Sequence, residues 1–371
     1  MIIRNKRNSS IELLRILSMF VIVIHHYAYH STFNWQVYNS QYTGALKVNL
    51  FLHFIGKLGV DIFVIIGAYF LCEKRFTFKR PINLILTTMF YSFGIWITLT
   101  YVLKVKLLIP LSWRDILLPF PLPSGYWFVY SYVIMLLAMP FLNIIIRALN
   151  RAQLIMLIME LIILWSFLVI GFIIFGGKPN TEINDLGFTQ TTFFTLLYFI
   201  AAYIRKYSGN ILNSKKYTAI GSLISLFLVV FCSYLANSQR TFNLILATFD
   251  TNGPLVILSS IFIFSFFRNC SLNSEIINYI ANSMFGVYLI HEDSFIRPII
   301  WRQLISSRLY EQSGINYLLA GLGYSLLVFI ICIIIDIICR RLIFKRVIDN
   351  LTYHITKIFN KLEELILHKY S

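Results

Sequence analysis

The chain has 371 residues, of which 58% are hydrophobic and only 13% are charged, and its mean hydropathy is +0.73. A soluble domain carries roughly 25% charged residues, so this composition excludes an ordinary water-soluble protein and indicates an integral membrane protein. The formal net charge is +16, but basic residues of membrane proteins collect in cytoplasmic loops, and we expect no nucleic-acid partner. The five cysteines have no metal-ligand spacing, and we predict no metal site.

Apolar runs of helical length recur along the whole chain. A membrane-spanning helix needs roughly 20 residues, and these runs are too long and too evenly apolar for barrel strands. The predicted fold class is therefore all-α, a polytopic membrane helical bundle of about ten transmembrane helices. The sixth and eighth runs are short for a full span. In chain order the runs cover residues 11–30, 51–72, 82–103, 126–147, 153–175, 191–204, 217–236, 254–267, 277–300 and 316–338.

The distribution of basic residues predicts the orientation of this bundle. The first run follows Arg4, Lys6 and Arg7 but has no small-residue cleavage site after it, so we interpret it as a retained helix and not a signal peptide. With the N-terminus inside, 21 of the 32 Lys and Arg residues lie in inner segments, eight lie in outer segments and three lie within the runs. This asymmetry predicts a multi-pass plasma-membrane protein with both termini in the cytoplasm.

The C-terminal tail has a different character from the rest of the chain. Apolar residues recur in it at helical spacing and basic residues flank them, which is typical of an amphipathic helix on the inner membrane surface. We therefore predict a transmembrane domain over 1–350 and a cytoplasmic amphipathic tail over 351–371. The apolar positions are Leu351, Ile355, Phe359, Leu362 and Ile366, and the flanking lysines are Lys357 and Lys361.

Ionisable residues inside membrane spans are costly, so each one is a functional candidate. The first run is rich in them, with Glu12, Arg15, His25, His26 and His30. Ten residues of helix rise about 15 Å, which places Arg15 near the cytoplasmic face and His25 past the middle of the span. Histidine suits general-base chemistry because its pKa lies near neutrality. The alternative is that Arg15 extends to the interface and that His25 makes a structural polar contact.

The second run contains the segment GVDIF at 59–63 and GAYFL at 67–71. The small residues allow close approach of another helix. Asp61 needs a buried partner, which His25, His26 or Lys57 would supply. A structural ion pair and a catalytic pair are both open at this point.

The ninth run ends in three consecutive titratable residues, His291, Glu292 and Asp293. They predict a cavity or an outer interface at this end of the run, and simple interfacial anchoring is the alternative. Arg297 lies on nearly the same helix face as Asp293 and is expected to pair with it. Earlier in the chain, Trp127 stands at the start of the fourth run, where aromatic belt residues are common.

Taken together, the order of these motifs resembles the acyltransferase-3 family of bacterial membrane acyltransferases over nearly the whole chain. The resemblance rests on the pair Arg15 and His25 in the first run, the GVDIF…GAYFL segment in the second, the basic turn 74–81, the YWF segment at 126–128 and the VYLIH segment at 287–291. The paired arginines expected after the second run are only partly matched, because Asn83 stands where a second arginine is expected.

The resemblance implies a ten-helix core and an activity. Members of the family move an acyl group, commonly acetyl, from cytoplasmic acyl-CoA to hydroxyl groups of extracytoplasmic glycans. It implies His25 as the leading catalytic residue with Arg15 as its companion, and we add Asp61, His291 and Glu292 as further catalytic candidates. Asp61 or Glu292 is expected to orient His25. The predicted cofactor-binding residues, whose cations would face the CoA phosphates, are Lys74, Arg75, Lys79, Arg80 and Trp127.

Several alternatives stay open from the sequence. The histidine either deprotonates a sugar hydroxyl for direct attack or carries the acyl group itself. Buried Arg, His and Asp residues would also suit a proton-coupled transporter or exporter of a sugar or small anion, although no internal repeat is evident. A purely structural or sensor protein is disfavoured by the number of titratable residues in the runs. The expected partners are acyl-CoA, a capsular or other cell-surface polysaccharide or its lipid-linked precursor, the lipid bilayer, and a second copy of the chain.

Overall fold

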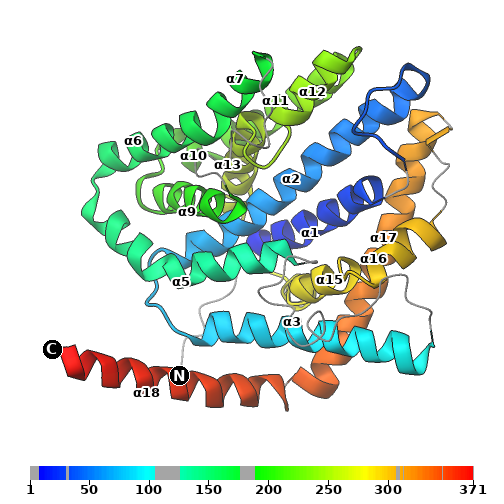
Figure 1. Cartoon of the computed structure of the whole chain (residues 1–371). Coiled ribbons are helices and arrows are strands. Elements are labelled where there is room, and N and C mark those ends of the chain that lie inside the picture. The colour runs from blue at the N-terminus through cyan, green and yellow to red at the C-terminus, as the bar shows by residue number, and fades with distance from the viewer. Residues whose placement is uncertain are drawn as a thin grey trace.

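The computed structural model describes residues 8–30, 33–104, 126–175, 189–305, 310–311, 313–344 and 346–370. Within these ranges every regular element is a helix (Figure 1), which confirms the all-α class. Seven helical stretches are long and apolar enough to cross a membrane. They are Ser9–Tyr29, Ser40–Leu71, Lys79–Val102, Trp127–Ala148, Arg151–Gly171, Lys215–Tyr234 and Gly314–Ile343. Ten spans and cytoplasmic termini stay predictions.

Helices α1 (Ser9–Tyr29) and α2 (Thr43–Leu71) pack closely together in the interior of the bundle (Figure 1). The side chain of Asn8 caps α1 by accepting from the N–H of Ser10 at 3.0 Å, and the 3₁₀ turn η1 (Ser40–Tyr42) leads into α2. A Cβ at Gly56 would lie 2.2 Å from the Cβ of His25, and one at Gly59 would lie 2.6 Å from the carbonyl oxygen of Ser18. Glycine at these two positions therefore permits the close approach that the sequence predicts.

The predicted sixth run forms helix α9 (Gln190–Tyr207), which is enclosed by other helices. It packs against α2, α5 (Trp127–Ala148) and α6 (Arg151–Ile162). Most of its residues are buried, so it is a central helix of the bundle. It is not one of the seven candidate spans. Around this centre lie five further elements: η3 (Ile163–Phe167), a π-helical turn; α7 (Leu168–Ile174); α10 (Asn210–Asn213); α11 (Lys215–Tyr234); and α12 (Gln239–Thr248).

The predicted eighth run forms the shorter helix α13 (Pro254–Arg268), but the ninth run is not one helix. It is broken into α14 (Glu275–Ala281), α15 (Met284–His291), α16 (Ile296–Pro298) and the π-helical turn η4 (Ile299–Leu304). At the break after α15, the Asp293 carboxylate accepts from the N–H of Phe295 at 2.9 Å. A side chain that caps the following turn competes with helix continuation, so the polar residues in this run interrupt it.

Helix α3 (Lys79–Ile97) continues into the π-helical turn η2 (Thr98–Val102), and α17 (Gly314–Cys339) continues into η6 (Arg340–Phe344). The predicted amphipathic tail is helix α18 (Ile348–Tyr370), which packs beside α3 (Figure 1). The rings of Phe78 and Phe359 are 5.2 Å apart, and Asn83 donates to the Thr352 hydroxyl at 3.3 Å. The helical tail is confirmed, and its place on the membrane surface stays a prediction.

Candidate active site

A cavity of about 1190 Å³ opens between the start of α1, the end of α2 and the start of α3. Basic side chains from four parts of the chain meet at its wall. They are Arg15 on α1, Lys74 in the turn after α2, Lys79 and Arg80 on α3, and Arg205 on α9. A cluster of cations around an open cavity suits an anionic ligand with several phosphate groups.

Arg80 is a residue of this wall with an unsatisfied hydrogen-bond donor among the described residues. Its Nη1 atom is buried and has no hydrogen-bond partner among the described residues. Other cations of the wall are already paired, because Arg15 contacts Glu12 at 3.3 Å and Arg205 contacts Glu73 at 2.8 Å. A buried guanidinium group without a partner is costly, and an incoming anion would satisfy it.

The predicted cofactor-binding residues divide into two groups. Lys74, Lys79 and Arg80 line the cavity, whereas Arg75 is exposed outside its lining. Trp127 also lies outside it and packs between Phe128 and Phe194, with ring centroids 6.1 and 6.2 Å away. The sequence analysis did not single out two wall residues, Arg205 and Tyr132, which come from distant parts of the chain.

A smaller cavity of about 260 Å³ adjoins the first and shares four of its lining residues, Arg15, Gly67, Leu84 and Tyr132. Its remaining wall is largely aromatic, with Phe63, Phe128 and Phe285. The ring of Phe128 lies 5.6 Å from Tyr288, whose ring lies 6.2 Å from His291. The two cavities therefore lead from the cationic wall toward the titratable residues at the end of α15.

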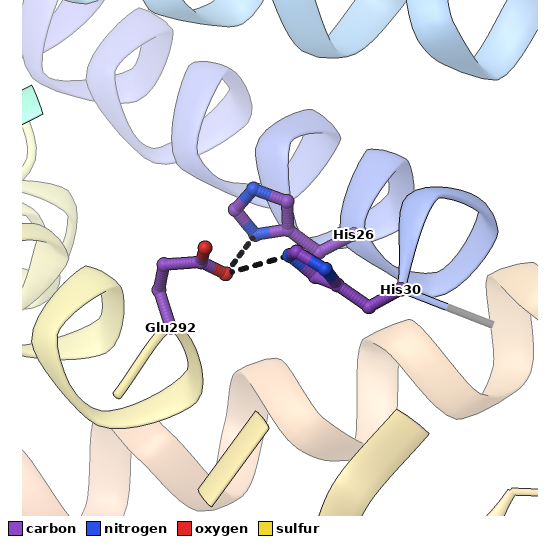
Figure 2. Close-up of side chains that lie close together, drawn as sticks. All are labelled: His26, His30 and Glu292. Carbon is purple, nitrogen blue, oxygen red and sulfur yellow. Dashed lines mark hydrogen bonds and ion pairs between the residues drawn. The ribbon is translucent and has the colours of Figure 1, made fainter. Parts of the chain in front are cut away.

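At that end, His26 of α1 and His30, the residue that follows α1, meet Glu292, the residue that follows α15. Figure 2 shows both imidazole rings pointing toward the same carboxylate oxygen. Oε2 of Glu292 lies 3.2 Å from Nδ1 of His26 and 3.1 Å from Nε2 of His30. The second carboxylate oxygen, Oε1, accepts from Arg297 at 2.9 Å. Glu292 is 3% exposed, so its charge is stabilised by these three neighbours and not by water.

The hydrogen bonds of His291 assign the proton on His26. Nδ1 of His291 lies 2.6 Å from the carbonyl oxygen of Val287, which can only accept, so this nitrogen carries the hydrogen. In a neutral His291 ring, Nε2 then accepts, and it lies 2.9 Å from Nδ1 of His26. Nδ1 of His26 therefore donates toward His291 and Glu292, and Nε2 of His26 is left with the free lone pair that a general base requires.

His25 occupies a different environment on the other side of α1. Its ring lies 5.3 Å from His53 and 5.2 Å from Tyr29, and its backbone-proximal atoms lie against Gly56. Nδ1 of His25 is buried and has no hydrogen-bond partner among the described residues. The expectation that Asp61 or Glu292 orients His25 is wrong for Glu292, which binds His26 and His30. The physical reason is that adjacent helix positions point about 100° apart, so only one of two consecutive histidines faces α15.

None of the partners expected for Asp61 forms a hydrogen bond or an ion pair with it in the described part of the chain. Nζ of Lys57 binds the carboxylate of Asp250 at 2.9 Å, and Asp250 lies in the loop after α12. Asp61 itself is fully buried, and neither of its carboxylate oxygens has a hydrogen-bond partner in the described part of the chain. Lys57 binds Asp250 and not Asp61, because the loop after α12 brings Asp250 directly to Lys57.

The expected pair of Asp293 with Arg297 is likewise not formed. Arg297 binds Glu292, and Asp293 accepts from the Tyr126 hydroxyl at 2.8 Å and from the N–H of Phe295 at 2.9 Å. The backbone N–H of Arg297 still donates to the carbonyl oxygen of Asp293 at 2.9 Å, so the helical spacing is kept, but the two side chains take other partners. Tyr126, at the start of α5, thereby ties α5 to the candidate site.

Sequence reasoning missed His53, which belongs to the layer of rings around His25. A signal was present, because His53, Lys57 and Asp61 follow one another at intervals of four residues and so share one face of α2. The contribution of Asp250 had no comparable signal, since it lies in a loop far from α2 in the chain.

The family model described as an acyltransferase domain, Acyl_transf_3, matches residues 8–337. The chain belongs to this family. The match covers nearly the whole chain, so the resemblance predicted from the motifs is confirmed, and this acyltransferase-3 protein is a membrane acyltransferase in the general sense. No curated protein and no solved structure matches the chain.

Proposed function

We propose that this acyltransferase-3 protein transfers an acyl group, with acetyl as the expected cargo, from acyl-CoA to a hydroxyl group of a cell-surface polysaccharide or its lipid-linked precursor. The observation that carries the proposal is the arrangement along α1. Arg15 lines a cation-rich cavity near one end of the helix, and His26 has an oriented, proton-accepting ring near the other. Eleven residues separate them, which corresponds to about 16 Å of helix rise.

The donor is proposed to bind at the cationic cavity. The diphosphate and 3′-phosphate of CoA are polyanionic, and Lys74, Lys79 and Arg80 supply matching cations. The pantetheine arm then enters the smaller aromatic cavity, whose wall residue Phe128 is separated from His291 only by Tyr288. With the basic segments in the cytoplasm, as the charge distribution predicts, the donor comes from the cytoplasm and the acceptor from the opposite side.

In the proposed reaction, Nε2 of His26 takes the proton of the acceptor hydroxyl as its oxygen attacks the thioester carbonyl. The tetrahedral intermediate collapses as the carbon–sulfur bond breaks, and the proton passes from His26 to the CoA thiolate. Glu292 and His291 hold the ring and stabilise its charged form. An acyl-histidine relay would use the same ring, with Nε2 attacking the thioester first.

We assign the base to His26 and not to His25, the residue implied by the resemblance. The reason is that His26 has a carboxylate at Nδ1 and His25 has none. In the described part of the chain, no hydrogen bond joins the Asp61 carboxylate to either ring, so we propose no catalytic role for it. Arg15 remains a donor-binding residue because it lines both cavities.

The test uses purified protein in lipid nanodiscs with radiolabelled acetyl-CoA and surface polysaccharide from the producing cells. The expected result is label in the polysaccharide with the wild type and with His25→Ala, and none above background with His26→Ala. Incubation with acetyl-CoA alone separates the two routes, since only the relay labels the protein. Absence of thioester cleavage in the wild type under all conditions would overturn the proposed function.

A further inference from the structure

A further cavity lies beyond the histidines, and the segment that connects α1 to α2 forms most of its wall. This cavity has a volume of about 530 Å³, and none of the eight described residues that line it is charged. Its wall combines aromatic rings with exposed amide and hydroxyl groups. The aromatic residues include Phe33, Tyr42 and Tyr310, and the polar residues are Asn34, Asn39 and Ser40.

The three rings form an ordered corner. Phe33 and Tyr310 stack with ring centroids 4.2 Å apart and planes within 8° of parallel. Tyr42 meets both edge-on, at 5.9 Å from Phe33 and 5.1 Å from Tyr310. Contacts of this kind fix the orientation of aromatic side chains, so the wall is set before any ligand arrives.

The segment that lines the cavity is anchored to the candidate active site by the ring of Trp35. Trp35 is 2% exposed and lies next to the cavity residue Asn34 in the chain. Its ring is 5.4 Å from His53 and 6.4 Å from Tyr29. Because Tyr29 precedes His30 at the end of α1, the chain segment that lines the cavity is anchored directly beside the histidines.

We propose that this cavity is an acceptor subsite that binds an uncharged pyranose unit of the glycan, an inference that rests on the proposed function. A pyranose ring has apolar C–H faces and a rim of hydroxyl groups, which match aromatic faces and amide groups respectively. An anionic sugar such as a uronic acid would find no cation among the described lining residues. The subsite therefore selects for neutral units next to the hydroxyl that is acylated.

The test measures binding without any acyl donor, so that it does not depend on catalysis. Oligosaccharides released from the surface polysaccharide of the producing cells are separated by anion exchange into neutral and anionic fractions, and binding to protein in nanodiscs is measured by calorimetry. The neutral fraction is expected to bind. Phe33→Ala should raise its Kd about tenfold, equivalent to about 1.4 kcal/mol, and Asn34→Leu should raise it about threefold.

Two comparisons keep the result interpretable. Phe33 is buried and its loss also removes two ring contacts within the segment, whereas Asn34 is exposed and its replacement should leave the fold intact. Tyr353→Ala is the matched control, because Tyr353 is 63% exposed on α18, and it should leave Kd unchanged. Preferential binding of the anionic fraction, or an unchanged Kd in both subsite variants, would overturn the subsite. Failure of acetyl transfer by the wild type would instead overturn the proposed function and leave the binding result standing.

Discussion

The two ends of α1 have different surroundings, and each suits a different step of the proposed reaction. Around Arg15 the protein is open, and cations from α1, the turn after α2, α3 and α9 line a large cavity. Around His26 it is closed, and Nδ1 of His26, Nε2 of His30 and both carboxylate oxygens of Glu292 each have a defined partner. A large anionic ligand needs an accessible wall of charge, whereas proton transfer needs a ring held in one tautomer. One helix carries both, which places the donor and the base at a fixed separation.

The most direct test of this difference between the two ends is to remove the proposed base, His26. His26→Ala should lower the rate of acyl transfer by roughly 10²–10⁴-fold, the usual contribution of a general base, while binding of acyl-CoA at the other end is retained. Transfer is measured with radiolabelled acetyl-CoA and binding by equilibrium dialysis. His354→Ala, an exposed histidine on α18, is the control and should keep wild-type activity. Equal loss of donor binding in His26→Ala would show that the two ends are not separate.

Glu292→Gln should have the next largest effect. The change keeps the shape of the side chain but removes the charge that stabilises protonated His26, so we expect a fall in kcat within the range of roughly 10²–10⁴-fold that general-base catalysis contributes. The KM for acyl-CoA should not change, because Glu292 does not line the donor cavity. Steady-state kinetics at several pH values distinguishes this from unfolding, since loss of the carboxylate should also move the pH dependence of kcat. A parallel change of kcat and KM at every pH would argue for a general structural defect.

Gly56→Ala tests the packing that joins the two ends. The new methyl group would lie 2.2 Å from the Cβ of His25, so α1 and α2 must move apart, and overpacking of this kind costs about 1–3 kcal/mol. Thermal unfolding in detergent should show a lower transition temperature. Gly94→Ala and Gly323→Ala are matched controls on other helices, since nothing lies within 4 Å of a Cβ at either position. A transition temperature equal to that of the controls would contradict the close helix contact.

Arg80→Ala sharpens the comparison from the open end and should have the smallest effect on the chemical step. Loss of one charge-assisted contact costs about 1.5–3 kcal/mol, so KM for acyl-CoA should rise by roughly 10–100-fold while kcat is retained. Lys216→Ala, which removes an exposed cation on α11, controls for the change in net charge. If removal of the 3′-phosphate from the donor weakens binding to the variant as much as it weakens binding to the wild type, Arg80 does not contact that phosphate.

Much of the architecture follows from the sequence, because long apolar runs have few alternatives in a membrane. The runs that became α1, α5, α11 and α17 are single helices near the predicted bounds, whereas α2 begins at Thr43, well before the predicted residue 51. The run 277–300 failed as a single helix because Glu292 and Asp293 find partners outside it. That outcome depends on the positions of α1 and α5, which no local pattern contains.

Several residues of the candidate site were predictable from the sequence, but the contacts between them were not. Arg15, His291 and Glu292 were all recognisable as costly polar residues in apolar surroundings. The choice between His25 and His26 depends on the rotation of α1 against α15, and a change of one residue turns the side chain by about 100°. The contact of Asp250 with Lys57 could not be predicted either, because it is made by a loop distant in the chain.

The most direct test of the account places the two substrates on opposite sides of a membrane. Protein is reconstituted into sealed vesicles, its orientation is determined by protease access to the α18 tail, and labelled acetyl-CoA and acceptor polysaccharide are supplied on chosen sides. The account predicts transfer only when acetyl-CoA is on the side of Arg15 and Arg80 and the polysaccharide is on the side of His26 and His30. Transfer that requires both substrates on the same side would contradict it.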